Sequence, residues 1–525
     1  MKLFASKKTK IILYGFLYLI FFTLSFPAVI PGQSQPVNGH SIFSFCAFFI
    51  MPFYILMIRQ VRKMRKRAAL LYIFGIPANL FVFYWIFNSM YLFGGLGVYT
   101  SSLIMALMVL GEISLFWLPF TMIYTWLEKR KKASPHIIAG LWTVIEAARN
   151  FFPVDFYWSA IGHSQYNNPF FIQFASVGSI YILSFFIVWT SLLVFSWMEG
   201  QKRKAETAAW LAVFLLLSSV SVYRLWVFDN IPIEKTVKVT LFQPNINQYD
   251  RNRRRMSRRK IISIFDSLLQ RVPEDTDILV WHEASFPARI DEDYRDYEAL
   301  WNDIFPGQTF FPKQIVGLDM VNISKRLTYN SAGFVENGKI QSVYHKLKLA
   351  PFGEYLPMEE FLNSIGMGTI VPSSVGRFNR GQFHTVYDFG IVKAAVLICF
   401  DGTFSENVRA FVKNDAELLV SITNDAWFDF SSAVYQHHSF YPFRAVESGR
   451  TIVRSANVGI SGMILPDGSV PVKTEIFKRD IITVDAPIYN IKTFYRTYGN
   501  VVLWMIVLWT VIYLVKVKYH ENRKS

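Results

Sequence analysis

The chain has 525 residues, of which 52% are hydrophobic and 17% are aromatic, and it carries a net charge of +16. So apolar a composition excludes an ordinary soluble globular protein. The charge is unevenly placed, because residues 229–498 hold 31 basic and 31 acidic residues and are neutral overall. The basic excess therefore belongs to the rest of the chain, and no nucleic-acid partner is expected.

Eight apolar runs predict membrane spans. They cover residues 11–30, 41–58, 68–88, 101–127, 135–150, 170–197, 207–228 and 500–516. Most approach or exceed the roughly 20 residues that cross the hydrocarbon core of a bilayer. We therefore expect a polytopic helical membrane domain with seven spans in residues 1–228, and an eighth span with a cytoplasmic tail in residues 499–525.

The connections between these runs predict the orientation. Basic residues cluster in the two terminal tails and in residues 59–67, 128–132 and 201–204, which share one side of the membrane if there are eight crossings. Lysine and arginine mark the cytoplasmic side. Both termini are therefore expected in the cytoplasm, and residues 229–498 are expected outside it.

Residues 229–498 have the pattern of a layered α/β domain. Six runs rich in Val, Ile and Thr predict strands. They are residues 237–243, 277–283, 314–321, 393–400, 417–424 and 451–459. Helical spacing occurs at residues 256–271 and 431–449. This alternation predicts strands that are buried on both faces.

Three charged residues fall in or near predicted spans. Glu146 and Arg149 are three residues apart and are expected to pair on one helix face. Glu112 lies inside the fourth span, where a charge is costly, so it is expected to face the bundle or a water-filled cavity. Substrate docking and an internal polar contact both explain these residues.

Three residues of the outer domain are suited to catalysis. Glu283 and Cys399 stand at the ends of predicted strands, and Lys346 precedes a Pro-Phe-Gly turn. Each alone has an ordinary interpretation, as a surface carboxylate, a solvated lysine and a small buried hydrophobe. However, Cys399 is the only cysteine in residues 229–498, and a free thiol outside the cytoplasm faces oxidation. An activated nucleophile explains its presence, with a carboxylate as general base and an ammonium as oxyanion donor.

The order Glu283, Lys346, Cys399 resembles the triad of the nitrilase, or carbon–nitrogen hydrolase, superfamily. Longer blocks resemble one branch of it, the apolipoprotein N-acyltransferase family. These blocks are "HKLKLAPFGEYLP" (345–357), "NDAWF" (424–428), "QHHSFYPFRAVESGR" (436–450) and "RSANVGISGMILPDG" (454–468), with "IEAARNFF" (145–152) and "YWSAIGHSQ" (157–165) in the membrane half. The resemblance implies an αββα sandwich at residues 229–498, on the periplasmic side of a bacterial inner membrane.

The resemblance also implies a ping-pong acyl transfer. Cys399 would take an acyl chain from a membrane phospholipid as a thioester, and the α-amine of a diacylated lipoprotein would collect it. Glu283 would be the base and Lys346 the oxyanion donor. Glu354 would position the lysine or assist proton transfer. A monomer is expected, and neither a cofactor nor a metal is implied; His437 and His438 lack the further ligands of a metal site.

Two residues depart from the family pattern. Phe400 and Asp401 stand where the family usually has Tyr and Glu, so a shorter carboxylate would orient the acceptor amine or the loop. Trp427 and Phe428 follow a predicted strand and are expected to line an acyl-chain groove or a lid.

Other functions remain open on the sequence alone. A membrane-bound nitrilase-type amidase or hydrolase would pass the acyl group to water, and a diverged paralogue would use other substrates. A non-enzymatic lipid or lipoprotein carrier predicts loss of the triad, whereas all three residues are present.

Overall fold

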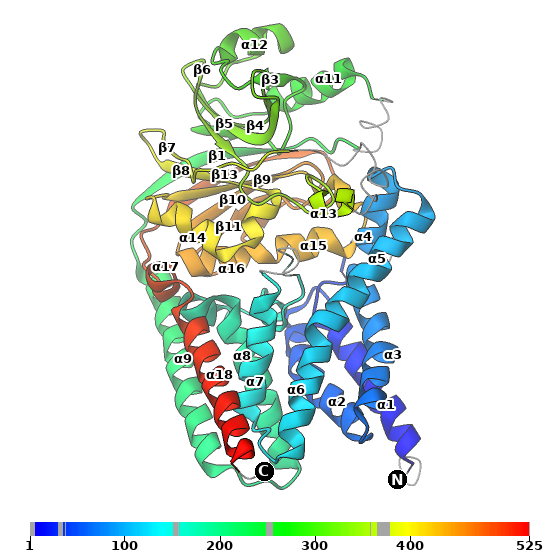
Figure 1. Ribbon diagram of the computed structural model, residues 1–525. Helices are drawn as coiled ribbons and strands as arrows, with labels where there is room; N and C mark the ends of the chain where they lie inside the picture. The colour runs from blue at the N-terminus through cyan, green and yellow to red at the C-terminus, as the bar shows by residue number, and fades with distance from the viewer. Residues whose placement is uncertain are drawn as a thin grey trace.

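The computed structural model describes residues 6–29, 35–36, 38–150, 156, 158–247, 256–357, 359–364 and 378–523. A bundle of helices carries a layered α/β domain at one end (Figure 1). The first helix begins, and the last helix ends, at the opposite end of the bundle (Figure 1). This arrangement places the described ends of the chain on one side, away from the α/β domain.

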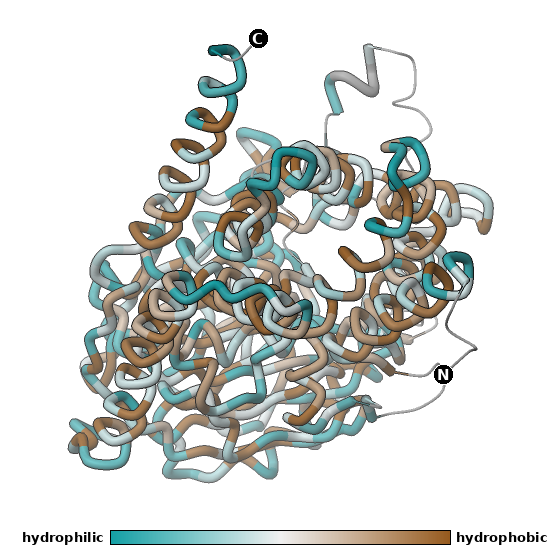
Figure 2. Tube along the Cα trace, turned by 90° about the horizontal axis from the view of Figure 1, so that it is seen from below, coloured by the Kyte–Doolittle hydropathy of each residue, from teal (hydrophilic) through white to brown (hydrophobic). Residues whose placement is uncertain are grey.

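The bundle contains nine main helices in the described residues. They are α1 (Lys7–Leu24), α2 (Ala47–Arg59), α3 (Met64–Phe83), α5 (Val98–Glu112), α6 (Leu118–Lys129), α7 (Pro135–Ala148), α8 (Ala175–Met198), α9 (Lys204–Asn230) and α18 (Val501–Asn522). A short helix α4 (Trp85–Asn88) lies between α3 and α5. Hydrophobic residues recur along the outward-facing helices, α18 among them (Figure 2).

Six helical segments of the described chain are long and apolar enough to cross a membrane. They are Ser41–Arg59, Met64–Phe83, Val98–Lys129, Phe171–Met198, Lys204–Asn230 and Val501–Asn522. The other two predicted spans are also helices: α1 has 18 residues and begins with three lysines in its first four residues, and α7 has 14 residues, most of them buried. The chain is therefore a polytopic helical membrane protein.

Charged residues inside the bundle are paired or hydrogen-bonded. Arg149 forms an ion pair with Glu112 at 3.0 Å, and both side chains are less than 10% exposed. The predicted pair of Glu146 with Arg149 is wrong, because the Glu146 carboxylate instead accepts hydrogen bonds from the indole of Trp142 and the backbone N–H of Ile161. Glu112, on another helix, neutralises the charge of Arg149, whereas two N–H groups donate to the Glu146 carboxylate.

The α/β domain contains two sheets. The first has the order β13-β1-β2-β4-β5-β6, with β3 beside β4, and the second has the order β12-β11-β10-β9-β8-β7. The first sheet comprises β1 (Lys235–Gln243), β2 (Ile278–Val280), β3 (Arg289–Asp291), β4 (Lys313–Asn322), β5 (Leu327–Glu336), β6 (Lys339–His345) and β13 (Asp480–Ile488). The second comprises β7 (Val386–Asp388), β8 (Lys393–Ile398), β9 (Leu418–Thr423), β10 (Thr451–Ala456), β11 (Gly462–Ile464) and β12 (Val472–Lys473).

Helices cover the outer face of each sheet (Figure 1). The first sheet carries α11 (Arg258–Leu269) and α12 (Tyr297–Ile304). The second sheet carries α14 (Ser405–Lys413), α15 (Ser432–His438) and α16 (Phe440–Ser448), which lie between that sheet and the bundle (Figure 1). One core cluster joins the facing sides of both sheets. The predicted αββα sandwich is therefore confirmed.

Helix α16 is buried on both of its sides. All nine of its residues are buried, and its Phe440, Phe443 and Val446 belong to the same hydrophobic cluster as the bundle helices. On the opposite side Ala445 belongs to the same core cluster as strands of the second sheet. The α/β domain therefore rests on the bundle through an apolar contact, not through a flexible linker alone. Two further short helices of the described residues are α13 (Glu359–Ser364) and α17 (Phe494–Tyr498).

Candidate active site

Cys399 occupies a sharp turn at the end of a buried strand. Residues Ala394–Ile398 of β8 are fully buried, and β8 runs parallel to β9. Directly after Ile398 the backbone of Cys399 has φ +51°, in the left-handed region that non-glycine residues rarely adopt, and a 3₁₀ turn continues to Thr403. Strained turns of this kind present a nucleophile above a sheet. The Cys399 side chain itself is half-buried.

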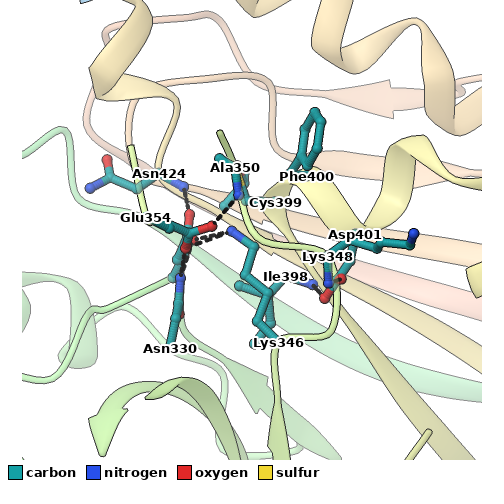
Figure 3. Close-up of polar contacts among 12 residues, drawn as sticks. Asn330, Lys346, Lys348, Ala350, Glu354, Ile398, Cys399, Phe400, Asp401 and Asn424 are labelled. Atoms are coloured by element: carbon teal, nitrogen blue, oxygen red, sulfur yellow. Dashed lines mark hydrogen bonds and ion pairs between the residues drawn. The ribbon is translucent and has the colours of Figure 1, made fainter. Parts of the chain in front are cut away.

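A buried ammonium is shared between two carboxylates beside this turn (Figure 3). Lys346, which directly follows β6, is 1% exposed. Its Nζ lies 3.2 Å from Oε1 of Glu283 and 2.9 Å from Oε1 of Glu354. The structure therefore brings together Glu283, Lys346 and Cys399, which are far apart in the sequence. The charges of Glu283 and Lys346 both act on the Cys399 thiol.

Hydrogen bonds fix both carboxylates. Asn330 Nδ2 lies 2.7 Å from Oε1 of Glu283 and 2.7 Å from Oε1 of Glu354. The second oxygen of Glu283 accepts from the backbone N–H of Asn424 at 2.8 Å, and that of Glu354 accepts from the backbone N–H of Ala350 at 2.7 Å. Each carboxylate is thus held at both oxygens, as a rigid site requires.

Burial and charge set the resting protonation states. Burial would lower the pKa of Lys346, but Glu283 and Glu354 outweigh it and hold that pKa well above its ordinary value. Burial raises the pKa of the Cys399 thiol, and the charge of Glu283 raises it further, whereas Lys346 opposes them. Cys399 is therefore protonated at rest and needs a base to become a nucleophile.

A glycine allows the Glu283 segment to lie close to the sheet. A Cβ on Gly317 of β4 would stand 2.1 Å from the carbonyl oxygen of His282 and 2.9 Å from Cα of Glu283. Both are backbone atoms, so any larger residue would displace the segment that carries the carboxylate.

Asp401 ties the Lys346 loop to the cysteine turn. Its carboxylate is fully buried and accepts from the backbone N–H of Lys348 and the hydroxyl of Tyr344, each at 2.7 Å, and from the backbone N–H of Ile398 at 3.4 Å. Burial raises its pKa to about 7. Of the two roles expected for this carboxylate, the geometry favours orientation of the loop.

The remaining predicted residues connect the site to the bundle. Phe400 points away from the carboxylates (Figure 3) and packs against the rings of Phe404 and Trp158, with centroids 5.1 and 6.4 Å away. The ring of Phe428 contacts the ring of Trp85 in α4, with the ring centroids 5.2 Å apart. Trp427 is 39% exposed, and its ring contacts that of Phe93 with the centroids 5.9 Å apart.

The sequence did not predict several residues that surround the triad. Asn330 in β5 is one, and a second group lies beneath Cys399, whose carbonyl oxygen accepts from the hydroxyl of Tyr441 at 3.1 Å. His437 Nε2 lies 3.3 Å from the same oxygen. In the sequence, His437 and Tyr441 lie in the block 436–450 that resembles the family, but no local pattern gave them a role at the site. Among the described residues no group of His, Cys, Asp and Glu could hold a metal ion.

Comparisons with known proteins match both halves of the chain. Residues 20–193 match the model of the apolipoprotein N-acyltransferase N-terminal domain, and residues 314–494 match the carbon–nitrogen hydrolase model. An apolipoprotein N-acyltransferase of Geobacter metallireducens is 28% identical over 84% of this chain and 85% of its own length. One of Haemophilus influenzae is 27% identical over 85% of both. A solved Saccharomyces cerevisiae member of branch 10 of the nitrilase superfamily aligns with 49% of this chain and 91% of its own, at 15% identity and a TM-score of 0.36.

The α/β domain and the matched model define a domain of the carbon–nitrogen hydrolase superfamily joined to a membrane bundle. Because both halves match and the relatives align along most of the chain, the assignment can be made narrower. The chain belongs to the apolipoprotein N-acyltransferase family.

Proposed function

We propose that the chain transfers an acyl chain from a membrane phospholipid to the N-terminal amine of S-diacylglyceryl-cysteine in apolipoproteins. The relatives carry the name of this activity. The observation that carries the proposal is the position of Cys399 at the face where the α/β domain meets the bundle. Phe400 and Phe404, on the turn that follows the thiol, belong to the hydrophobic cluster of the bundle helices.

In the first half-reaction the thiol attacks the sn-1 ester of the phospholipid. Glu283 takes the proton of Cys399 as the S–C bond forms, and Lys346 donates a hydrogen bond to the developing oxyanion. When the intermediate collapses, the C–O bond breaks and Glu283 returns the proton to the leaving alkoxide. The products are a thioester on Cys399 and a lysophospholipid.

In the second half-reaction the acceptor amine attacks the thioester carbonyl. The C–N bond forms, the C–S bond breaks, and the proton lost by the amine passes through Glu283 to the sulfur. An amide leaves and the thiol is restored. Glu354 keeps Lys346 in place through the 2.9 Å ion pair. No cofactor takes part in this chemistry.

The proposal includes the arrangement of the chain in the membrane. Residues 1–228 form the membrane domain, residues 229–498 the catalytic domain, and residues 499–525 the eighth span and cytoplasmic tail. The catalytic domain lies on the periplasmic side of a bacterial inner membrane, and the enzyme acts as a monomer. Trp427 and Phe428 line the path of the acyl chain.

Purified protein incubated with phospholipid labelled in its acyl chain tests the function. A labelled thioester that requires Cys399 and is discharged to a diacylglyceryl peptide supports acyl transfer. Rapid release of free fatty acid in the presence of the peptide would instead indicate a hydrolase, and absence of labelling would indicate a carrier.

A further inference from the structure

A charged cavity lies at the end of the second sheet where its parallel strands begin. Its lining includes Lys393, the first residue of β8, and Arg450, which directly precedes β10. The cavity has a volume of about 350 Å³, within the range of small-molecule sites. Cys399 follows the other end of β8, whose six residues span about 20 Å, so this cavity is separate from the active site.

The course of the chain places this cavity beside the membrane. Glu234, which lines it, is four residues beyond the end of α9, and Arg496 is five residues before the start of α18. Both helices are long and apolar enough to cross a bilayer. Four or five residues reach at most about 14–18 Å, and α17, which contains Arg496, lies between the α/β domain and α18 (Figure 1). Lipid headgroups at the ends of these helices are therefore close to the cavity.

Arg450 is a buried cation in this cavity, with 4% of its surface exposed. It follows Gly449, whose left-handed backbone, with φ +66°, ends α16. A Cβ on Gly449 would stand 2.3 Å from the carbonyl oxygen of Ile491, so the glycine lets the segment after β13 lie against this turn. Arg450 then donates to the carbonyl oxygens of Tyr489 at 2.8 Å and Ala416 at 2.9 Å, which fix its position.

Two guanidinium groups of the cavity have hydrogen-bond partners but no close counter-ion. In the described part of the chain, Arg450 and Arg496 donate to carbonyl and amide oxygens, and no carboxylate oxygen lies within 4.0 Å of either. Burial and the charge of Arg496 lower the pKa of Arg450 to about 10, although three carboxylates act in the opposite direction. Burial also lowers the pKa of Arg496. Both remain charged at neutral pH, so an anion between them would offset their repulsion.

The three carboxylates that line the cavity leave this positive charge in place. Glu417 already pairs with Lys235 at 2.9 Å and accepts from the backbone N–H of Lys393 at 2.8 Å. Glu234 and Asp415 are exposed, so solvent screens their charges. Four basic side chains line the same cavity: Lys393, Arg450, Lys492 and Arg496.

We propose that this cavity binds a phosphate group between Arg450 and Arg496, with the exposed Lys492 as a third cation. Guanidinium groups form bidentate, charge-assisted hydrogen bonds with phosphate oxygens. The phosphate is that of a phospholipid headgroup or a free phosphate ion, and the position beside α9 and α18 favours the headgroup. A lipid held there ties the catalytic domain to the bilayer. This inference is independent of the proposed function, because no step of the acyl transfer involves these residues.

The test measures binding of two probes to the full-length protein in detergent micelles. The first is a dialkyl-ether phosphatidylglycerol, which has a phosphate group but no ester for a nucleophile to attack, and native mass spectrometry measures its affinity. The second is inorganic phosphate, measured by isothermal titration calorimetry. The variant is Arg496→Gln. The matched control is Arg289→Gln, which removes the same charge from an exposed position of β3 in the first sheet.

Arg496→Gln should bind the tightest lipid about 10–100-fold more weakly, as expected for loss of a charge-assisted hydrogen bond. Arg289→Gln should keep the parent affinity. Loss of lipid binding supports the proposal with a headgroup as ligand, and loss of inorganic phosphate binding alone supports it with free phosphate as ligand. If the parent binds neither probe, or if Arg496→Gln binds both as well as the parent does, the proposal is wrong.

The thermal unfolding midpoint shows whether each variant folds. Arg450 is left unchanged, because it also holds the carbonyl groups around it. If Arg496→Gln does not fold, Lys492→Gln replaces it, since Lys492 is exposed and its loss leaves the core intact. This variant should weaken binding about two- to fivefold, and an unchanged affinity would again contradict the proposal. Neither probe is a substrate for acyl transfer, so a failure here is distinct from a failure of the proposed function.

Discussion

At the scale of residues, the site combines one ammonium with two carboxylates. Glu283, Lys346 and Glu354 together carry a net negative charge. This charge disfavours loss of the Cys399 proton to solvent. Transfer of that proton to Glu283 removes the unfavourable charge, so the cluster fits a base that acts during the attack. Asn330 donates to both carboxylates and limits the cost of burying them.

Replacement of Lys346 should slow thioester formation. Lys346→Ala removes the proposed oxyanion donor and leaves two buried carboxylates without their cation. Loss of one oxyanion donor costs about 10²–10³-fold in rate. The measurement is the initial rate of Cys399 labelling by phospholipid. The exposed Lys325→Ala is the control and should keep the parent rate. A Lys346→Ala enzyme of full activity would remove the ammonium from the mechanism.

Asp401 should make stability depend on pH. Its pKa is raised to about 7 in the fold, from about 3.9 in an unfolded chain. The native state therefore holds a proton that the unfolded state has lost between these values, and stability falls as pH rises from about 4 to about 7. Three pH units correspond to about 4 kcal/mol at most. Asp401→Asn cannot ionise, so the unfolding midpoint of the parent should fall relative to this variant over that range; parallel midpoints would contradict the burial of an ionisable group there.

At the scale of elements, the sequence predicted the buried parallel strands and missed the hairpin that carries part of the site. Strands β8 and β9 consist mostly of apolar residues, and β10 begins with Thr, Ile and Val, which made them recognisable. The β5–β6 pair contains polar residues on both faces, and its one clear signal is Asn337-Gly338, where both residues have positive φ as a tight hairpin turn requires. The helical spacing at residues 431–449 corresponds to two helices, α15 and α16, separated at Ser439.

Glu283 and Cys399 could be predicted because they follow predicted strands, and Lys346 because it precedes a Pro-Phe-Gly turn in a block that resembles the family. The partners of these residues could not be predicted. Asn330 lies inside β5 with no local feature that sets it apart from any other polar residue of a strand. Its contact with Glu283 and Glu354 exists only because the first sheet brings β5 beside the loops after β2 and β6. Contacts of this kind depend on the tertiary fold, which no local pattern records.

Replacement of Gly317 should separate activity from folding. Gly317→Ala places a Cβ against the backbone that carries Glu283, and a displacement of about 1 Å at a reacting group costs about 10²-fold in rate. The matched control is Gly97→Ala, since a Cβ at Gly97 meets nothing within 4 Å. Both variants are compared by the labelling rate and by the unfolding midpoint. Equal rates in the two variants would contradict the close approach of β4 to the Glu283 segment.

At the scale of the whole molecule, the bundle and the α/β domain are joined through polar as well as apolar contacts. Ser179, at a kink in α8 where its φ is +57°, donates to Glu447 of α16 at 2.6 Å. Glu447 also accepts from Ser405 of α14 and pairs with Arg444. The helix of the bundle and two helices of the domain thus share one buried carboxylate, which favours a fixed relation between the two parts.

The proposed orientation can be tested by labelling from outside the cell. Single cysteines are placed at the exposed Lys478 of the α/β domain and Arg62 between α2 and α3, in a chain without Cys46 and Cys399. A membrane-impermeant maleimide should label the cysteine at 478 in intact cells and the cysteine at 62 only after disruption, because the basic loops mark the cytoplasmic side. The reverse pattern would place the proposed catalytic domain in the cytosol.

The burial of α16 between sheet and bundle fixes the position of Cys399 relative to the bundle. A domain held in this way cannot rotate away from the bundle to meet a diffusing amine. Every acceptor therefore has to reach the site at the membrane surface beside the bundle. A peptide that travels with its own lipid tails satisfies this condition and a free amino acid does not. Discrimination between these two acceptors then requires no binding pocket for the polypeptide, because the fixed position of the catalytic domain is sufficient.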